Sequence, residues 1–101
     1  MNTKMKALYI IVTAGFAETM VEFIRSRGAT GATIFNARGS NPLQKTILGI
    51  SIDIEKEIVL SLIESELADK ILEEIKQNPD FKSEARAICF TLPVEKTVGL
   101  S

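Results

Sequence analysis

The chain has 101 residues, of which 46% are hydrophobic and 25% are charged, and its formal net charge at pH 7 is −1. This length suits one domain with one core, so we expect residues 1–101 to form a single domain. The near-neutral charge argues against a nucleic-acid or membrane-surface binder, because such proteins usually carry a strongly basic face.

The sequence contains no histidine and a single cysteine, Cys89, within the apolar run 87–92, AICFTL. We expect Cys89 to be a buried structural thiol. A chain with one cysteine cannot form an internal disulfide, which is typical of a reducing compartment and predicts a cytoplasmic location. The N-terminal segment has the outline of a secretory signal, but we expect it to be retained because it contains the most strand-like run. No apolar run approaches the roughly 20 residues that a membrane-spanning helix needs.

The first half of the chain predicts a strand, a helix and a second strand. Residues 6–13, KALYIIVT, form a continuous apolar run rich in β-branched and aromatic residues, as in a buried strand. Residues 16–27 place apolar side chains at helical spacing with charged residues mostly on the other side. Gly28 then ends this helix as a C-cap, and residues 31–37 form the second strand.

The second half predicts two further strands and a second helix. Isoleucines alternate with polar residues over 50–54, in the manner of a half-exposed strand. Residues 57–63, EIVLSLI, form a mainly apolar run and predict a central strand. Residues 65–77 form an amphipathic helix that ends near Pro79, and residues 87–92 form the last long strand.

The element order is β-α-β-β-α-β. It predicts an α+β, ferredoxin-like βαββαβ fold, with a four-stranded antiparallel sheet and two helices on one face. The first and third strands then lie in the centre of the sheet, and these are the two runs that are apolar at nearly every position. A lone domain would leave one sheet face in water, and its central strands should alternate in polarity. They do not alternate, so we expect the second face to be buried against other copies in a homo-oligomer.

No set of residues suits an enzyme or a metal site. The chain has no histidine to pair with a nucleophile, no metal-ligand cluster and no glycine-rich dinucleotide or P-loop motif. It does carry cations in segments that a βαββαβ sheet brings to one end, near Gly39 and Ser40, whose backbone N–H groups can approach a phosphate. These cations are Arg38, Lys45, Lys56, Lys82 and Arg86. They predict either a small-anion site or ordinary solubilising charges on loops.

Over nearly its whole length the chain resembles the nitrogen regulatory P-II family, specifically its shorter P-II-like members. The segment 7–39 looks like the family's first strand, first helix and second strand, and its GATGATIFNARG portion matches a Gly-x-Thr-Gly-x-Thr run before the family's T-loop. Residues 55–75, EKEIVLSLIESELADKILEEI, look like the third strand and second helix. The resemblance implies a βαββαβ trimer that acts in signal transduction and nitrogen regulation.

The resemblance also implies a ligand and a partner. Members bind ATP, ADP or a related small effector in clefts between subunits, and the bound state sets the shape of a loop that docks on a membrane transporter or another regulated protein. Here that loop would be residues 38–48. By position, Thr33 matches a residue near the adenine, and Lys56 and Arg86 match basic residues of the phosphate site. Gly39, Ser40 and Asn41 match the T-loop base, and Arg38 and Lys82 complete the expected ligand-binding set.

Three departures from the family pattern leave the effector open. The loop is short and has no tyrosine, the segment SEAR stands where the phosphate-binding B-loop normally carries glycines, and the C-terminal arginine pair is missing. ATP, ADP, AMP, another anion or no ligand therefore stay as alternatives. Two rival interpretations are an effector-free interaction module and a metal-tolerance trimer of the CutA type. The absence of histidine counts against the second.

Overall fold

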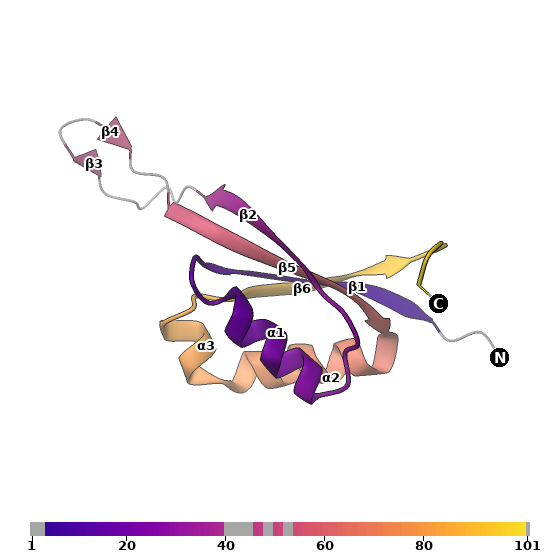
Figure 1. Ribbon diagram of the computed structural model, residues 1–101. Helices are drawn as coiled ribbons and strands as arrows, with labels where there is room; N and C mark the ends of the chain where they lie inside the picture. Colours follow the sequence, from indigo (N-terminus) through magenta and orange to yellow (C-terminus); the bar gives the residue numbers. More distant parts are fainter. Residues whose placement is uncertain (1–3, 40–45, 48–49, 52–53, 101) are drawn as a thin grey trace.

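The computed structural model describes residues 4–39, 46–47, 50–51 and 54–100. Its main sheet is antiparallel with the strand order β2-β5-β1-β6, and the helices lie on one side of it (Figure 1). The strands of this sheet are β1 (Met5–Thr13), β2 (Thr33–Gly39), β5 (Ile54–Glu64) and β6 (Ile88–Val94). The helices are α1 (Ala17–Ser26), α2 (Ser65–Gln77) and α3 (Pro79–Ser83). The predicted α+β, ferredoxin-like fold is confirmed.

The two apolar runs occupy the centre of the sheet, as predicted, because β1 and β5 are the inner strands. The predicted strand over 50–54 is divided. Ile50 belongs to β4 (Ile50–Ser51), which pairs with β3 (Thr46–Ile47) in a small ribbon beyond the ends of β2 and β5 (Figure 1). Ile54 begins β5, and Ile52 lies outside the described residues.

Hydrogen bonds hold the end of the first helix and the start of the second strand in place. Gly28, at a φ of +116°, donates its N–H to the Arg25 carbonyl, and Ala29 donates to the Ile24 carbonyl, each at 3.0 Å. This is the glycine-ended cap predicted for α1. Ser61, buried in β5, donates its hydroxyl to the Gly31 carbonyl at 2.6 Å and so ties the start of β2 to the sheet.

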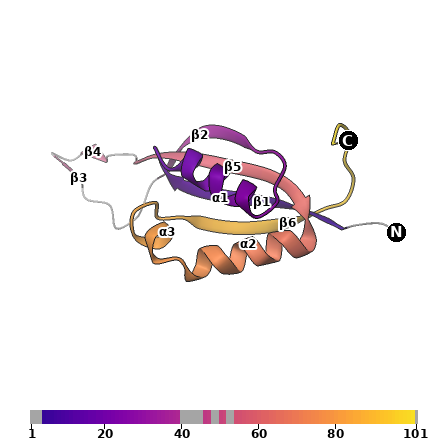
Figure 2. The same cartoon turned by 60° about the horizontal axis from the view of Figure 1, so that its bottom comes forward.

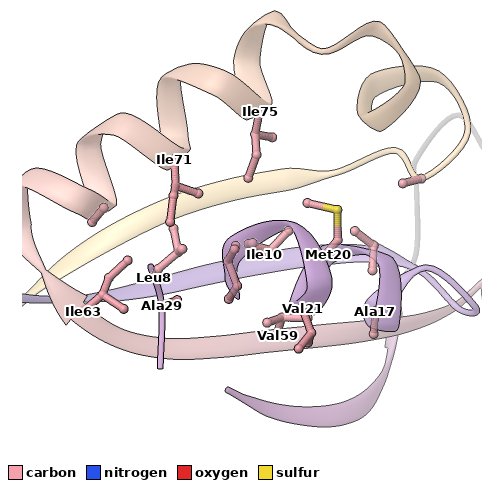
Figure 3. Close-up of a cluster of buried hydrophobic side chains, with 14 residues drawn as sticks. Leu8, Ile10, Ala17, Met20, Val21, Ala29, Val59, Ile63, Ile71 and Ile75 are labelled. Atoms are coloured by element: carbon pink, nitrogen blue, oxygen red, sulfur yellow. The ribbon is translucent and has the colours of Figure 1, made fainter. Parts of the chain in front are cut away.

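The core lies between the helices and one face of the sheet (Figures 2 and 3). Every second residue of β1 and β5 points into it, which is the period that a strand requires. These side chains meet α1 through Met20 and Ile24, and α2 through Ile71 and Ile75. The strand residues on this helix-covered face are Leu8, Ile10, Val12, Val59, Ser61 and Ile63, and all are at most 4% exposed.

The opposite face of the sheet is apolar and lacks a covering layer within the described part of the chain. The register aligns apolar side chains across all four strands, for example Ile88, Ile11, Ile58 and Phe35 in one row. The Tyr9 ring, in the next row, stacks on that of Phe90 at 5.0 Å. We call this surface the open face. Its members are Ala7, Tyr9, Ile11, Thr33, Phe35, Ala37, Ile58, Leu60, Leu62, Ile88, Phe90 and Leu92.

None of the helices within the described ranges combines the length and the apolar character that crossing a membrane requires.

Candidate functional site

A cleft of about 710 Å³ opens at the end of the sheet where β2 stops and β5 starts. This volume falls within the range of small-molecule sites, about 300–1,000 Å³. Lys56, Ile58 and Ile11 face it, and the register places all three on the open face. The cleft is lined by Ile11, Ala37, Arg38, Gly39, Ile54, Lys56, Ile58, Lys82, Arg86, Ala87 and Ile88.

Four cationic side chains from separate segments meet at this cleft. Arg38 comes from the end of β2, Lys56 from β5, Lys82 from α3 and Arg86 from the link before β6. The topology predicted this convergence from the sequence, and the structure shows it. None of the described residues that line the cleft is acidic, so it has cations around an apolar floor of isoleucine and alanine. Such a lining suits an anion with an apolar part.

The side chain of Lys56 in β5 lies beside Gly39 at the end of β2. A Cβ atom at position 39 would lie 3.4 Å from Lys56 Cγ and 3.5 Å from Lys56 Cε, which is ordinary van der Waals contact. The two residues therefore form adjoining parts of the cleft lining.

Lys82 is placed by α3, a short helix that the sequence analysis did not predict. The Asn78 side chain accepts hydrogen bonds from the N–H groups of Asp80 (2.9 Å) and Phe81 (3.3 Å), and Pro79 occupies the first helical position. An asparagine cap followed by proline is a helix start signal, and here the same pair both ends α2 and begins α3. Phe81 anchors α3 by packing edge-to-face against Phe23, with ring centroids 5.1 Å apart.

The link between α3 and β6 holds Arg86 in an unusual conformation. Arg86 has a φ of +50°, and it is the one non-glycine residue with positive φ in the described ranges. Its neighbours are fixed by backbone hydrogen bonds, since Thr13 donates to the Ala85 carbonyl and Ala87 donates to the Phe81 carbonyl, both at 2.9 Å. Ala85 is also buried.

Glu57 organises the turn between β1 and α1, a role that no sequence feature indicates. Its Oε1 accepts hydrogen bonds from the N–H groups of Gly15 (2.6 Å) and Ala17 (3.3 Å) at the start of α1. The same turn is bonded to the residues that precede Arg86 and Lys56, because the Thr13 N–H donates to the Ala85 carbonyl and the Ala14 N–H donates to the Glu55 carbonyl at 3.1 Å. Glu57 therefore holds the scaffold that joins the Arg86 link to β5.

The remaining predicted site residues are Thr33, Ser40 and Asn41. Thr33 and Gly39 begin and end β2, so at about 3.3 Å per residue they are about 20 Å apart. Thr33 lines a separate cavity of about 260 Å³ with Thr30, Leu60 and Leu100. Ser40 and Asn41, like Lys45 and most of the 38–48 loop, lie outside the described residues.

Cys89 lies on the helix-covered face of β6, paired with Ile10, and is partly buried. Burial raises the pKa of its thiol to about 12, because a thiolate would lose its hydration there. This is consistent with the structural thiol that the sequence predicted. No group of three or more histidine, cysteine or acidic residues suited to a metal ion occurs in the described part of the chain.

Comparison with known proteins identifies the family. The family model described as Nitrogen regulatory protein P-II matches residues 5–101. Comparison with curated protein sequences finds no significant match.

Solved structures share the fold at low sequence identity. A candidate PII-like signaling protein from Thermus thermophilus has a TM-score of 0.69 at 23% identity, over 91% of this chain and 88% of that one. CPII, a nitrogen regulatory PII-like protein from Thiomonas intermedia K12 bound to ADP, AMP and bicarbonate, has a TM-score of 0.67 at 18% identity, over 94% and 97%. The B. subtilis GlnK–ATP complex has a TM-score of 0.66 at 13% identity, over 96% and 89%. Since the family model covers nearly the whole sequence, the chain belongs to the nitrogen regulatory protein P-II family.

Proposed function

We propose that this chain is a P-II-type regulator that binds a small phosphorylated effector, an adenine nucleotide, in the cationic cleft. The observation that carries the proposal is the convergence of Arg38, Lys56, Lys82 and Arg86 around an apolar floor. Guanidinium and ammonium groups form charge-assisted hydrogen bonds with phosphate oxygens, and an apolar floor suits a planar base. The ADP and AMP bound to CPII and the ATP bound to GlnK support this ligand class.

The working form would be a homotrimer that covers the open face. The cleft lies at the cationic end of that face, so a subunit packed there would form part of its wall. Thr33 is too far from Gly39 to touch the same small ligand within one chain. It would contribute from a neighbouring subunit, and the ligand site would then be intersubunit.

The regulatory output would be the segment 38–48, which begins at the cleft with Arg38 and Gly39. A ligand that binds one shape of this segment more tightly would shift the population toward it. That shape would then contact a membrane transporter or another partner. This mechanism needs no catalytic step, and the protein would act in the cytoplasm as a regulator and not as an enzyme.

Calorimetric titration of the purified oligomer with ATP, ADP and AMP tests the ligand. We expect binding of at least one of them, and about tenfold or greater weakening on Lys56→Ala or Lys82→Ala, because hydrogen bonds to charged groups contribute about 1.5–3 kcal/mol each. Arg25→Ala removes an exposed cation of α1 outside the cleft and should leave affinity unchanged. Absence of binding at millimolar nucleotide to a folded oligomer would contradict the proposal and favour an effector-free interaction module.

Limited trypsin digestion tests the regulatory output. Lys45 offers a cleavage site within the segment 38–48. We expect saturating nucleotide to slow cleavage after Lys45 while leaving cleavage after Lys96, near the C-terminus, unchanged. If cleavage after Lys45 is equally fast with and without nucleotide, the ligand does not change the segment 38–48, and the proposed regulatory output is wrong even if the nucleotide binds.

A further inference from the structure

Arg86 has a backbone conformation that favours glycine. At a φ of +50° it lies in the left-handed region, where the Cβ atom of an L-residue crowds the following carbonyl oxygen. Glycine adopts this region freely, and asparagine tolerates it better than arginine does. Arginine is therefore a poor choice at this position for the stability of the fold alone.

The surrounding backbone imposes this conformation. Ala85, on one side, is buried and accepts a hydrogen bond from Thr13 of β1, and Ala87, on the other, donates to Phe81 of α3. Both bonds measure 2.9 Å, and both partners belong to other elements of the fold. The chain must turn between these two fixed points, and Arg86 makes the turn.

No contact of the Arg86 side chain within the described part of the fold offsets the free-energy cost of this backbone conformation. It is exposed, and no hydrogen bond or ion pair with another described residue engages its guanidinium. It does line the cleft, together with Lys82 and Lys56. Lys82 reaches the same cleft from α3 with ordinary helical geometry, which makes it a natural comparison.

We propose that Arg86 is retained at a glycine-favouring position as a pre-positioned anion anchor, so that the fold gives up stability for affinity. The proposal rests on the proposed function and adds a positioning role for the backbone of this link. The left-handed turn, fixed from both sides, directs the side chain toward the cleft before a ligand arrives. A pre-positioned donor loses less conformational entropy on binding than a freely moving one.

Two measurements on substitutions of Arg86 test the trade-off: the thermal midpoint without ligand, and the affinity for ADP and for inorganic pyrophosphate. We expect Arg86→Gly to raise the midpoint by a few degrees, on the order of 4 °C, because glycine relieves the strain. The same variant should lose at least about tenfold in affinity for both ligands, since it removes charge-assisted hydrogen bonds. Arg86→Ala should lose as much affinity without the gain in midpoint, because alanine keeps the Cβ atom.

Lys82→Ala and Arg25→Ala are the matched controls. Lys82→Ala should weaken binding with no gain in midpoint, and Arg25→Ala should change neither quantity. An Arg86→Gly variant with an unchanged or lowered midpoint would overturn the trade-off, and one that binds ADP and pyrophosphate like the wild type would overturn the anchor role. In both cases the proposed function would survive if the wild type binds ADP. If the wild type binds none of ATP, ADP, AMP and pyrophosphate, the proposed function and the anchor role both fall.

Discussion

The two faces of the main sheet have nearly the same apolar composition but very different surroundings. On the helix-covered face, Leu8, Ile10 and Val12 of β1 are fully buried beneath the helices. On the open face, Ile88 is 58% exposed and Leu92 is 48% exposed. An apolar run on both sides of a strand predicts burial of both sides, and the described residues of this chain supply the covering layer for only one of them.

A charge placed on the open face has the largest expected effect. If the open face is the proposed subunit interface, Phe90→Glu would bury a carboxylate in each contact, and an unpaired buried charge costs several kcal/mol. We expect sedimentation or light scattering to show a monomer near 11.1 kDa, with helical circular dichroism retained. Val98→Glu, at a fully exposed position near the C-terminus, is the control and should leave the mass of the oligomer unchanged. An unchanged mass for Phe90→Glu would mean that the open face is not a subunit interface.

Two adjacent isoleucines of β1 compare the faces directly, since Ile10 points to the helices and Ile11 to the open face. Ile10→Ala should lower the free energy of unfolding by about 2–5 kcal/mol, the usual effect of emptying a core site. Ile11→Ala should act mainly through assembly. Its effect in urea unfolding should therefore depend on protein concentration, whereas that of Ile10→Ala should not. Equal, concentration-independent losses would contradict the distinction.

The same contrast explains what the sequence could predict. Local pattern was sufficient for β1, for α2 and for the centre of the sheet, because apolar period and topology agree there. The failure of β1 and β5 to alternate also predicted an apolar second face, and its burial in a homo-oligomer stays a prediction. These features depend only on neighbours in sequence, or on a topology with few alternatives.

Features that depend on a long-range register could not be predicted. Four of the five predicted cations line one cleft, because topology alone brings their segments to one end, and the fifth, Lys45, lies outside the described residues. Glu57, in contrast, reaches the start of α1 only through the pairing of β5 with β1. The positive φ of Arg86 arises from bonds to Thr13 and Phe81 on either side of it. Helix α3 is a different case. Its start signal, Asn78 followed by Pro79, is visible in the sequence, but the same pair also marks the end of α2.

A moderate loss of stability is expected when Glu57, at the polar end of the helix-covered face, is replaced. Glu57→Ala removes the acceptor of two backbone N–H groups at the start of α1, and we expect a loss of about 1–3 kcal/mol in the free energy of unfolding. Glu55→Ala, an exposed neighbour, should change stability by about 0.5 kcal/mol or less. Urea unfolding of the two variants measures the difference. Equal effects would mean that the turn holds α1 without the carboxylate.

The smallest expected effect concerns the reactivity of the Cys89 thiol on the helix-covered face. Its pKa of about 12 in the folded state lies above the value of 9.0 for a free thiol, so the protein keeps it protonated when the unfolded chain would ionise it. Its contribution to stability is therefore complete below pH 9 and is lost as the pH rises from 9 toward 12. At pH 8, where the thiolate is the reacting species, we expect a disulfide reagent to label Cys89 slowly in the folded protein and rapidly in urea.

A thiol moved to other positions completes this test. In a Cys89→Ala background, Val98→Cys should react at the rate of a free thiol, because the side chain is fully exposed. Leu92→Cys, on the open face of the same strand and outside the cleft lining, should react slowly in the oligomer and rapidly once Phe90→Glu has dissociated it. Rapid labelling of Leu92→Cys in the intact oligomer would show that this part of the open face stays in contact with water. The covering subunit would then have to lie over the other rows, nearer the cleft.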